Sequence, residues 1–166
     1  MHENAVTRCR HIGVVLASFA ALTESNDAFA LLQSCNVSAT AVNFGTYNPL
    51  SGSPNDATGT ITVSCQVSLI GLFVSWTIAL NSGSSGNYGA RQMRSGANSL
   101  SYNLYTSAAR SSVWGDGTGG TTVVSANPFL IVGSNNVNYS VYGRISAGQD
   151  QAAGTYTDVI TVTVTY

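Results

Sequence analysis

The most informative feature of this 166-residue sequence is how little charge it carries. Charged residues make up 8% of the chain, and lysine is absent. Both histidines and both glutamates lie before residue 31, so residues 31–166 contain no histidine, lysine or glutamate. The usual general bases are therefore missing from this part, and a Ser-His-Asp triad cannot form there. We expect no enzymatic activity.

The few charges that remain after residue 30 balance one another. The basic ones are Arg91, Arg94, Arg110 and Arg144, and the acidic ones are Asp56, Asp116, Asp150 and Asp158. Four arginines cannot neutralise enough phosphates for nucleic-acid binding, and there is no basic amphipathic helix for a membrane surface. Two cysteines without a histidine leave too few ligands for a metal site. We expect no nucleic-acid partner, no stable membrane insertion and no cofactor.

The N-terminus has the pattern of an export signal. Arg8 and Arg10 precede an apolar run of eleven residues, 12–22, which is too short to span a bilayer. Small residues at Ala28 and Ala30 predict cleavage after Ala30, and a second possible cut follows Ala20. The alternative for this run is a buried N-terminal helix.

Cleavage after Ala30 predicts two parts, a signal peptide at residues 1–30 and a single domain at residues 31–166. Cys9 leaves with the signal, so Cys35 and Cys65 remain as one pair in an exported chain. This pair predicts a disulfide formed in an oxidising compartment, with two free buried thiols as the alternative.

Apolar and polar residues alternate with period two along most of the chain, which is the pattern of β-strands. The expected strands cover residues 36–44, 58–67, 73–81, 99–106, 121–124, 129–132, 138–145 and 155–166, while 91–96 is either a strand or a loop. We expect Trp76 in the core and Trp114, beside the glycine-rich hairpin loop 115–120, as a candidate exposed contact. No segment after residue 30 has the pattern of a long helix, so the sequence predicts an antiparallel β-sandwich.

The final segment, residues 155–166, has the most regular alternation. Ile160, Val162, Val164 and Tyr166 share one face, and threonines occupy the other. No residues follow it in the sequence, and it lacks the Lys or Pro that commonly protects an edge strand. It could therefore receive a strand from another chain by β-augmentation, or it could lie centrally and be fully paired.

Seven short segments together resemble the spore coat protein U domain family. They are CNVSAT at residues 35–40, VNFGTY at 42–47, GTITVSC at 59–65, YNLY at 102–105, VWGDG at 113–117, YGRI at 142–145 and GTYTD at 154–158. The resemblance covers about residues 34–166. It implies an immunoglobulin-like β-sandwich that lacks its final strand, with a disulfide joining Cys35 to Cys65.

The same resemblance implies a structural subunit of an archaic chaperone–usher pilus, or fimbrium, that supports adhesion or biofilm formation. The implied partners are a periplasmic chaperone, an outer-membrane usher and neighbouring pilin subunits, and the implied location is a secreted or cell-surface fibre reached through the periplasm. A donor strand from a partner would occupy a groove between the first and last strands. Its expected walls are Val37, Ala39 and Ala41 on one side and Ile160, Val162, Val164 and Tyr166 on the other.

The segment before Cys35 departs from the family's pattern. Cleavage after Ala30 leaves residues 31–34, which reach roughly 14 Å and are too short for a full donor strand. The chain would then accept a strand and donate none, as a tip or terminal subunit does, whereas cleavage after Ala20 leaves a longer segment. The alternative function is a stand-alone secreted binding or adhesion domain with a self-complete β-sandwich.

Overall fold

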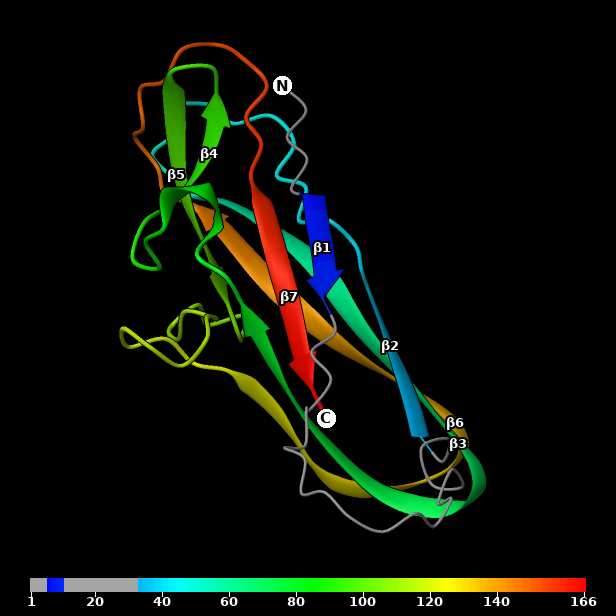
Figure 1. Ribbon diagram of the computed structural model, residues 1–166. Coiled ribbons are helices and arrows are strands. Elements are labelled where there is room, and N and C mark those ends of the chain that lie inside the picture. The colour runs from blue at the N-terminus through cyan, green and yellow to red at the C-terminus, as the bar shows by residue number, and fades with distance from the viewer. Residues whose placement is uncertain (1–5, 11–32) are drawn as a thin grey trace, which may run out of the picture.

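The computed structural model of the chain describes residues 6–10 and 33–166 and is all-β over these residues (Figure 1). Its elements are β1 (Val6–Arg10), β2 (Gln33–Ala39), β3 (Asn55–Leu80), the short 3-10 turn η1 (Gly83–Ser85), β4 (Arg91–Ser95), β5 (Asn98–Tyr105), β6 (Val124–Ile145) and β7 (Val159–Thr165). None of the described residues belongs to a helix that could cross a membrane. Both predicted cleavage sites, after Ala20 and after Ala30, lie outside the described residues.

β3 and β6 form one long antiparallel ribbon, whose register runs from Asn55↔Ile145 to Ile78↔Val124. The prediction of separate strands at 58–67 and 73–81 was wrong because the ladder continues past an irregularity between them. Val67 pairs with Gly133 and Leu72 pairs with Ile131, so residues 68–71 of β3 stand opposite residue 132 alone. Extra residues in one strand bend a ribbon, and Gly133 adopts the positive φ of 72° that this bend requires.

A second irregularity explains how β6 includes a proline. Val74 pairs with Phe129 and Trp76 pairs with Ala126, so residues 127–128 of β6 face residue 75 of β3. A bulge removes the need for a ladder hydrogen bond from the proline nitrogen, which is why Pro128 is tolerated there. The segments expected at 129–132 and 138–145 therefore belong to a single strand, β6, whereas the strand expected at 121–124 was wrong except for Val124, where β6 begins.

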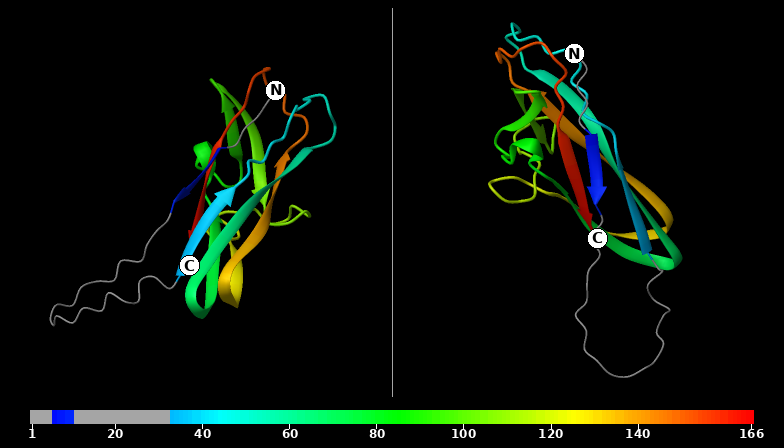
Figure 2. Two further views of the ribbon diagram at one scale, coloured as in Figure 1. Left: turned by 90° about the vertical axis from the view of Figure 1, so that its right-hand side faces the viewer. Right: turned by 45° about the horizontal axis from the view of Figure 1, so that its top comes forward.

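The bent ribbon contributes to both layers of a sandwich. The sheet order is β1-β7-β3-β6-β5-β4, and β2 pairs with β3 beside this path. One layer contains β2, residues 55–67 of β3, residues 133–145 of β6, β5 and β4. The other contains the end of β3, the start of β6, β7 and β1. Figure 1 shows β7 crossing in front of the ribbon, and Figure 2 shows the same arrangement from two further sides.

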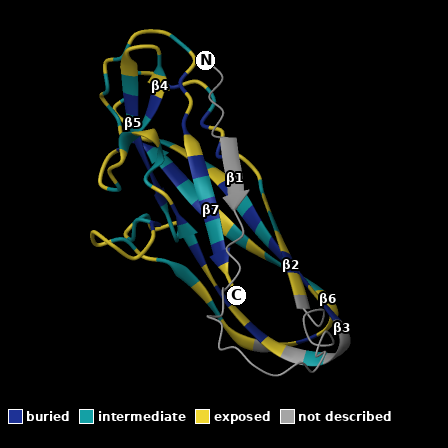
Figure 3. Cartoon of the chain, in the orientation of Figure 1, coloured by how far each residue is buried: buried dark blue, intermediate teal, exposed yellow. Residues whose placement is uncertain are grey.

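Buried residues alternate with more exposed ones along the strands, as Figure 3 shows, and the buried set forms the core. The inward residues expected from residues 58–67 and 73–81 are all buried, each with at most 5% of its surface exposed: Ile61, Val63, Cys65, Val67, Val74, Trp76, Ile78 and Leu80. Leu100, Tyr102 and Leu104 of β5 are buried as well. The undecided segment 91–96 is the strand β4, with Arg91 and Met93 buried.

Candidate functional site: the groove beside the terminal strand

β7 lies between two strands of different origin. On one side, residues 162–165 pair antiparallel with residues 77–80 of β3. On the other side, residues 159–163 pair in parallel with Val6–Arg10 of β1, in the register Val6↔Val159 to Arg10↔Thr163. The edge of β7 that faces away from β3 is therefore able to pair with a further strand, and here that strand comes from the N-terminal region of the same chain.

β1 occupies the gap between the two outer strands of the sandwich. Figures 1 and 2 show β1 lying between β7 and β2. Within the described residues β2 pairs on one side only, with residues 61–67 of β3. The edges of β7 and β2 thus flank a single gap, which is the position in which a final strand would complete the sandwich.

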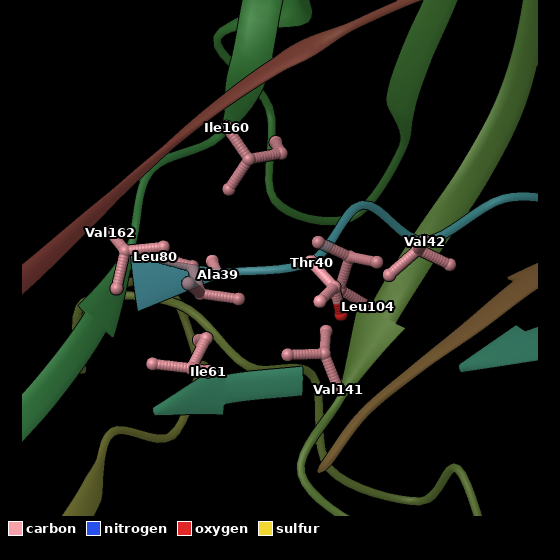
Figure 4. Close-up of a pocket in the computed structure, with 9 residues that line it drawn as sticks. All are labelled: Ala39, Thr40, Val42, Ile61, Leu80, Leu104, Val141, Ile160 and Val162. Carbon is pink, nitrogen blue, oxygen red and sulfur yellow. The ribbon is translucent and has the colours of Figure 1, made fainter. Parts of the chain in front are cut away.

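An apolar recess lies between the layers beside this gap. It is shallow, with a cavity volume of about 20 Å³, which is room for about one water molecule. Figure 4 shows its nine lining side chains converging on one space from β2 and the segment just after it, and from β3, β5, β6 and β7. They are Ala39, Thr40, Val42, Ile61, Leu80, Leu104, Val141, Ile160 and Val162. Eight of the nine are hydrophobic, so the recess presents an apolar surface beside the outer edge of β7.

The structure brings some of the sequence-predicted groove residues together and separates others. Ala39, Ile160 and Val162 line the recess. Val164 is buried, with 5% of its surface exposed, but lies outside the recess. Tyr166 does not share the buried face, because β7 ends at Thr165 and 48% of the tyrosine surface is exposed.

The first groove wall changes its alternation part-way along, so the predicted position of Ala41 was wrong. Val37 and Ala39 of β2 are half-buried, whereas Ala41 is exposed and Val42 lines the recess. β2 ends at Ala39, and Thr40 then fixes the chain by exchanging bonds with Thr60: the Thr40 nitrogen donates to the Thr60 carbonyl at 2.8 Å, and the Thr60 nitrogen donates to the Thr40 hydroxyl at 2.9 Å. After this point the inward positions are even-numbered.

The disulfide ties the same wall to the ribbon. Cys35 of β2 and Cys65 of β3 are register partners with a Cα–Cα distance of 4.0 Å, and their sulfur atoms are bonded. Both side chains are buried. The prediction of this disulfide is confirmed, and its place in the ladder means that it holds β2 against β3 at the groove.

A buried polar cluster at the start of β7 was not found by sequence reasoning. Arg91 has no exposed surface, and its guanidinium donates to the Asn103 Oδ1 atom at 2.7 Å and to the Trp114 carbonyl at 2.7 Å. Asp158 is 3% exposed and accepts a 2.8 Å bond from the Tyr102 hydroxyl. Burial lowers the pKa of Arg91 and raises that of Tyr102, and the nearby Asp158 carboxylate raises the Tyr102 pKa further.

Trp114 belongs to this interior and not to the surface. The expectation of an exposed contact was wrong, because only 1% of its surface is accessible. Its Nε1 atom donates to the Ile78 carbonyl at 3.0 Å, and its backbone bridges to Thr122. The adjacent glycine-rich loop suggested exposure, but the Ile78 carbonyl that binds the indole is 36 residues away in sequence. Trp76 is buried, as expected, and its Nε1 atom donates to the Tyr139 hydroxyl at 2.9 Å.

Fold and groove together define an immunoglobulin-like β-sandwich in which β7 pairs on its outer edge with β1 of the same chain. The family model described as Spore Coat Protein U domain matches residues 20–163. A curated relative, Protein U of Myxococcus xanthus, is 37% identical over 136 residues, which cover 75% of this chain and 71% of the relative. The chain therefore belongs to the spore coat protein U domain family.

A solved structure with a similar fold is a chaperone–subunit complex. It is the crystal structure of the CsuC–CsuE chaperone–tip adhesion subunit pre-assembly complex from archaic chaperone-usher Csu pili of Acinetobacter baumannii. One chain of that complex matches with a TM-score of 0.53 and 25% sequence identity over 81% of the present chain. The match spans 40% of the length of that chain.

Proposed function

We propose that this chain is a structural subunit of a secreted chaperone–usher type fibre that assembles by donor-strand complementation and supports adhesion or biofilm formation. The observation that carries the proposal is the outer edge of β7, which lies beside an apolar recess and pairs with a strand. A donated strand would add its backbone to β7 and place alternate apolar side chains in the recess.

Export supplies the condition under which this edge becomes available. In the proposal, residues 1–30 are a signal peptide that is removed after Ala30, so β1 leaves with it and β7 loses its parallel neighbour. A periplasmic chaperone would then supply a strand, an outer-membrane usher would receive the subunit, and a neighbouring pilin would replace the chaperone strand. Because residues 31–34 are too short to form a full donor strand, the chain would occupy a tip or terminal position.

Co-purification tests the proposal directly. Residues 31–166 would be secreted into a bacterial periplasm with and without a tagged two-domain pilus chaperone encoded beside a homologous subunit gene. We expect a stoichiometric complex, and poor recovery of the subunit in the absence of the chaperone. A Val162→Asp variant should lose capture, because Val162 is 2% exposed and lines the recess.

The matched control is Thr163→Asp, which places the same charge on the neighbouring, half-buried residue of β7. Capture of this variant should be close to that of the unmodified chain. Equal capture of both variants would place strand binding elsewhere and contradict the proposed groove. Circular dichroism of the chains secreted without chaperone separates loss of binding from loss of folding.

A second candidate is a stand-alone secreted binding or adhesion domain with a self-complete sandwich. The observation that favours it is that β1 of the same chain already pairs with β7. It requires residues 6–10 to remain attached after export. N-terminal sequencing of the exported protein, followed by urea unfolding, separates the two candidates. A soluble, cooperatively unfolding monomer that needs no chaperone would favour the stand-alone domain.

A further inference from the structure

The two halves of β7 are held to the molecule in different ways. In the described residues the β3–β7 ladder runs from Thr77↔Thr165 to Leu80↔Val162, so Val159, Ile160 and Thr161 lie beyond the end of β3. The outer edge of β7 pairs with β1 from residue 159 to residue 163. The first half of the accepting edge therefore needs support on its inner side from something other than β3.

Asn81, the residue after β3, supplies part of this support with its side chain. Its backbone nitrogen donates to the Thr161 carbonyl at 3.1 Å, as the next position of a ladder would. The Thr161 nitrogen donates to the Asn81 Oδ1 atom at 2.9 Å, although a ladder would use the Asn81 main-chain carbonyl. That carbonyl is instead occupied by Arg91, whose Nε and Nη2 atoms donate to it at 3.1 and 2.8 Å.

The arginine that holds Asn81 is itself fixed. Arg91 is fully buried, and its remaining bonds go to Asn103 and to the main chain of Trp114. A buried guanidinium held by four hydrogen bonds is costly to move, because any lost bond leaves a charged donor desolvated. These bonds hold Asn81 in place. Asn81 in turn fixes Thr161 through the two hydrogen bonds between them.

Asp158 fixes the other end of this half-strand. Its Oδ1 atom accepts bonds from the Val159 and Ser84 nitrogens, both at 2.9 Å, and its Oδ2 atom accepts the Tyr102 hydroxyl. Gly83 packs so closely on this carboxylate that a Cβ atom would collide with it, and the φ of Gly83 is +68°. The carboxylate therefore orients the first peptide group of β7 from inside the protein.

These contacts decide which way the accepting edge points. Backbone hydrogen-bonding groups of successive residues in a strand point to opposite sides, so fixing Thr161 toward Asn81 directs those of Ile160 and Val162 to the outer edge. We propose that Asn81 and Asp158 are positioning residues that hold residues 159–161 in register for an incoming strand. This inference rests on the proposed function, since it assigns a role in strand acceptance.

Disulfide trapping in the full chain, residues 1–166, tests the inference with β1 as the incoming strand. In the first variant, Val162→Cys, the new cysteine is the register partner of the native Cys9. This pair probes the half of β7 that β3 supports. The other combines Thr7→Cys, Cys9→Ser and Ile160→Cys, and probes the half that β3 does not reach. Each reduced, refolded chain is oxidised with glutathione, and the rate of each crosslink is followed by peptide mass spectrometry.

Asn81→Ala in each background should slow the crosslink at the Thr7/Ile160 pair by at least roughly fivefold, because the Asn81 Oδ1 atom loses its bonds from the Thr161 nitrogen at 2.9 Å and from the Gly83 nitrogen at 3.2 Å. The crosslink at the Cys9/Val162 pair should change by less than about twofold, because the ladder to β3 remains there. Asn81→Asp keeps an acceptor oxygen and should restore the rate. Asp158→Ala should show the same selectivity as Asn81→Ala.

The outcomes separate this inference from the proposed function. Equal slowing at both pairs would indicate a general effect on folding and would overturn the positioning role. Unchanged rates at both pairs would overturn it as well. If neither crosslink forms even with Asn81 and Asp158 intact, β1 does not pair with the edge of β7 and the positioning role falls, whereas the proposed function stands or falls separately with chaperone capture of residues 31–166.

Discussion

Removing the disulfide should destabilise the domain by an amount that the structure sets. The bond closes a loop with a sequence separation of 30 residues, for which the chain-entropy estimate gives about 3.6 kcal/mol at 25 °C. The suitable perturbation is the double variant Cys35→Ala/Cys65→Ala. Alanine is preferred to serine because both sites are buried, and an unpaired hydroxyl there would add a separate penalty.

Urea unfolding of the full chain, residues 1–166, in which β1 pairs with β7, followed by tryptophan fluorescence, measures this loss. With a slope of about 1.5–2 kcal/mol/M for a domain of this size, the midpoint should fall by roughly 2 M. Hydrogen exchange adds a local readout: amides of β2 should lose the most protection, because in the described residues this strand pairs with β3 alone. A midpoint shift below about 0.5 M, or uniform loss of protection, would refute the reasoning that the bond holds β2 in place.

Three further predictions concern buried and charged side chains. Trp114→Phe should cost about 1–3 kcal/mol in urea unfolding, because the Ile78 carbonyl loses its indole donor. Burial raises the pKa of Tyr102, so its stabilising contribution is present below about pH 10 and lost above it, and Tyr102→Phe should flatten alkaline unfolding curves. The hydrogen bond from Arg144 lowers the pKa of Asp56, so its contribution is present above about pH 4 and lost below it. Asp56→Asn should reduce the acid sensitivity of the urea midpoint.

Strand identity and inward faces could be predicted because they depend on local alternation. Period two is a property of the strand itself, and it identified the buried residues of β3, β5 and β7. Continuity could not be predicted in the same way. Two segments that alternate separately form one continuous strand when the neighbouring strand can pair with both despite extra residues between them. Only the register of β3 with β6 shows the bulges at residues 68–71 and at Pro128.

The groove was predicted in outline and missed in detail for a similar reason. Alternation placed Ala39, Ile160 and Val162 on its walls, but it could not detect the shift that replaces Ala41 with Val42. That shift follows from contacts between Thr40 and Thr60, which are far apart in sequence. The buried polar cluster is still harder to predict from the sequence. An arginine or aspartate is usually exposed, so it is expected on the surface unless its partners, which are distant in sequence, are known.

The location of Asp158 bears on whether the edge of β7 is protected or available. Soluble proteins commonly guard an exposed edge strand with lysine, proline or an outward charge that opposes pairing. Residues 155–166 contain no lysine or proline, and Asp158 is their single charge. With 3% of its surface exposed and its oxygens bonded to Ser84, Tyr102 and Val159, this carboxylate does not oppose an incoming strand. The one charge that could have blocked pairing instead orders the backbone that pairing requires, which favours an accepting edge over a protected one.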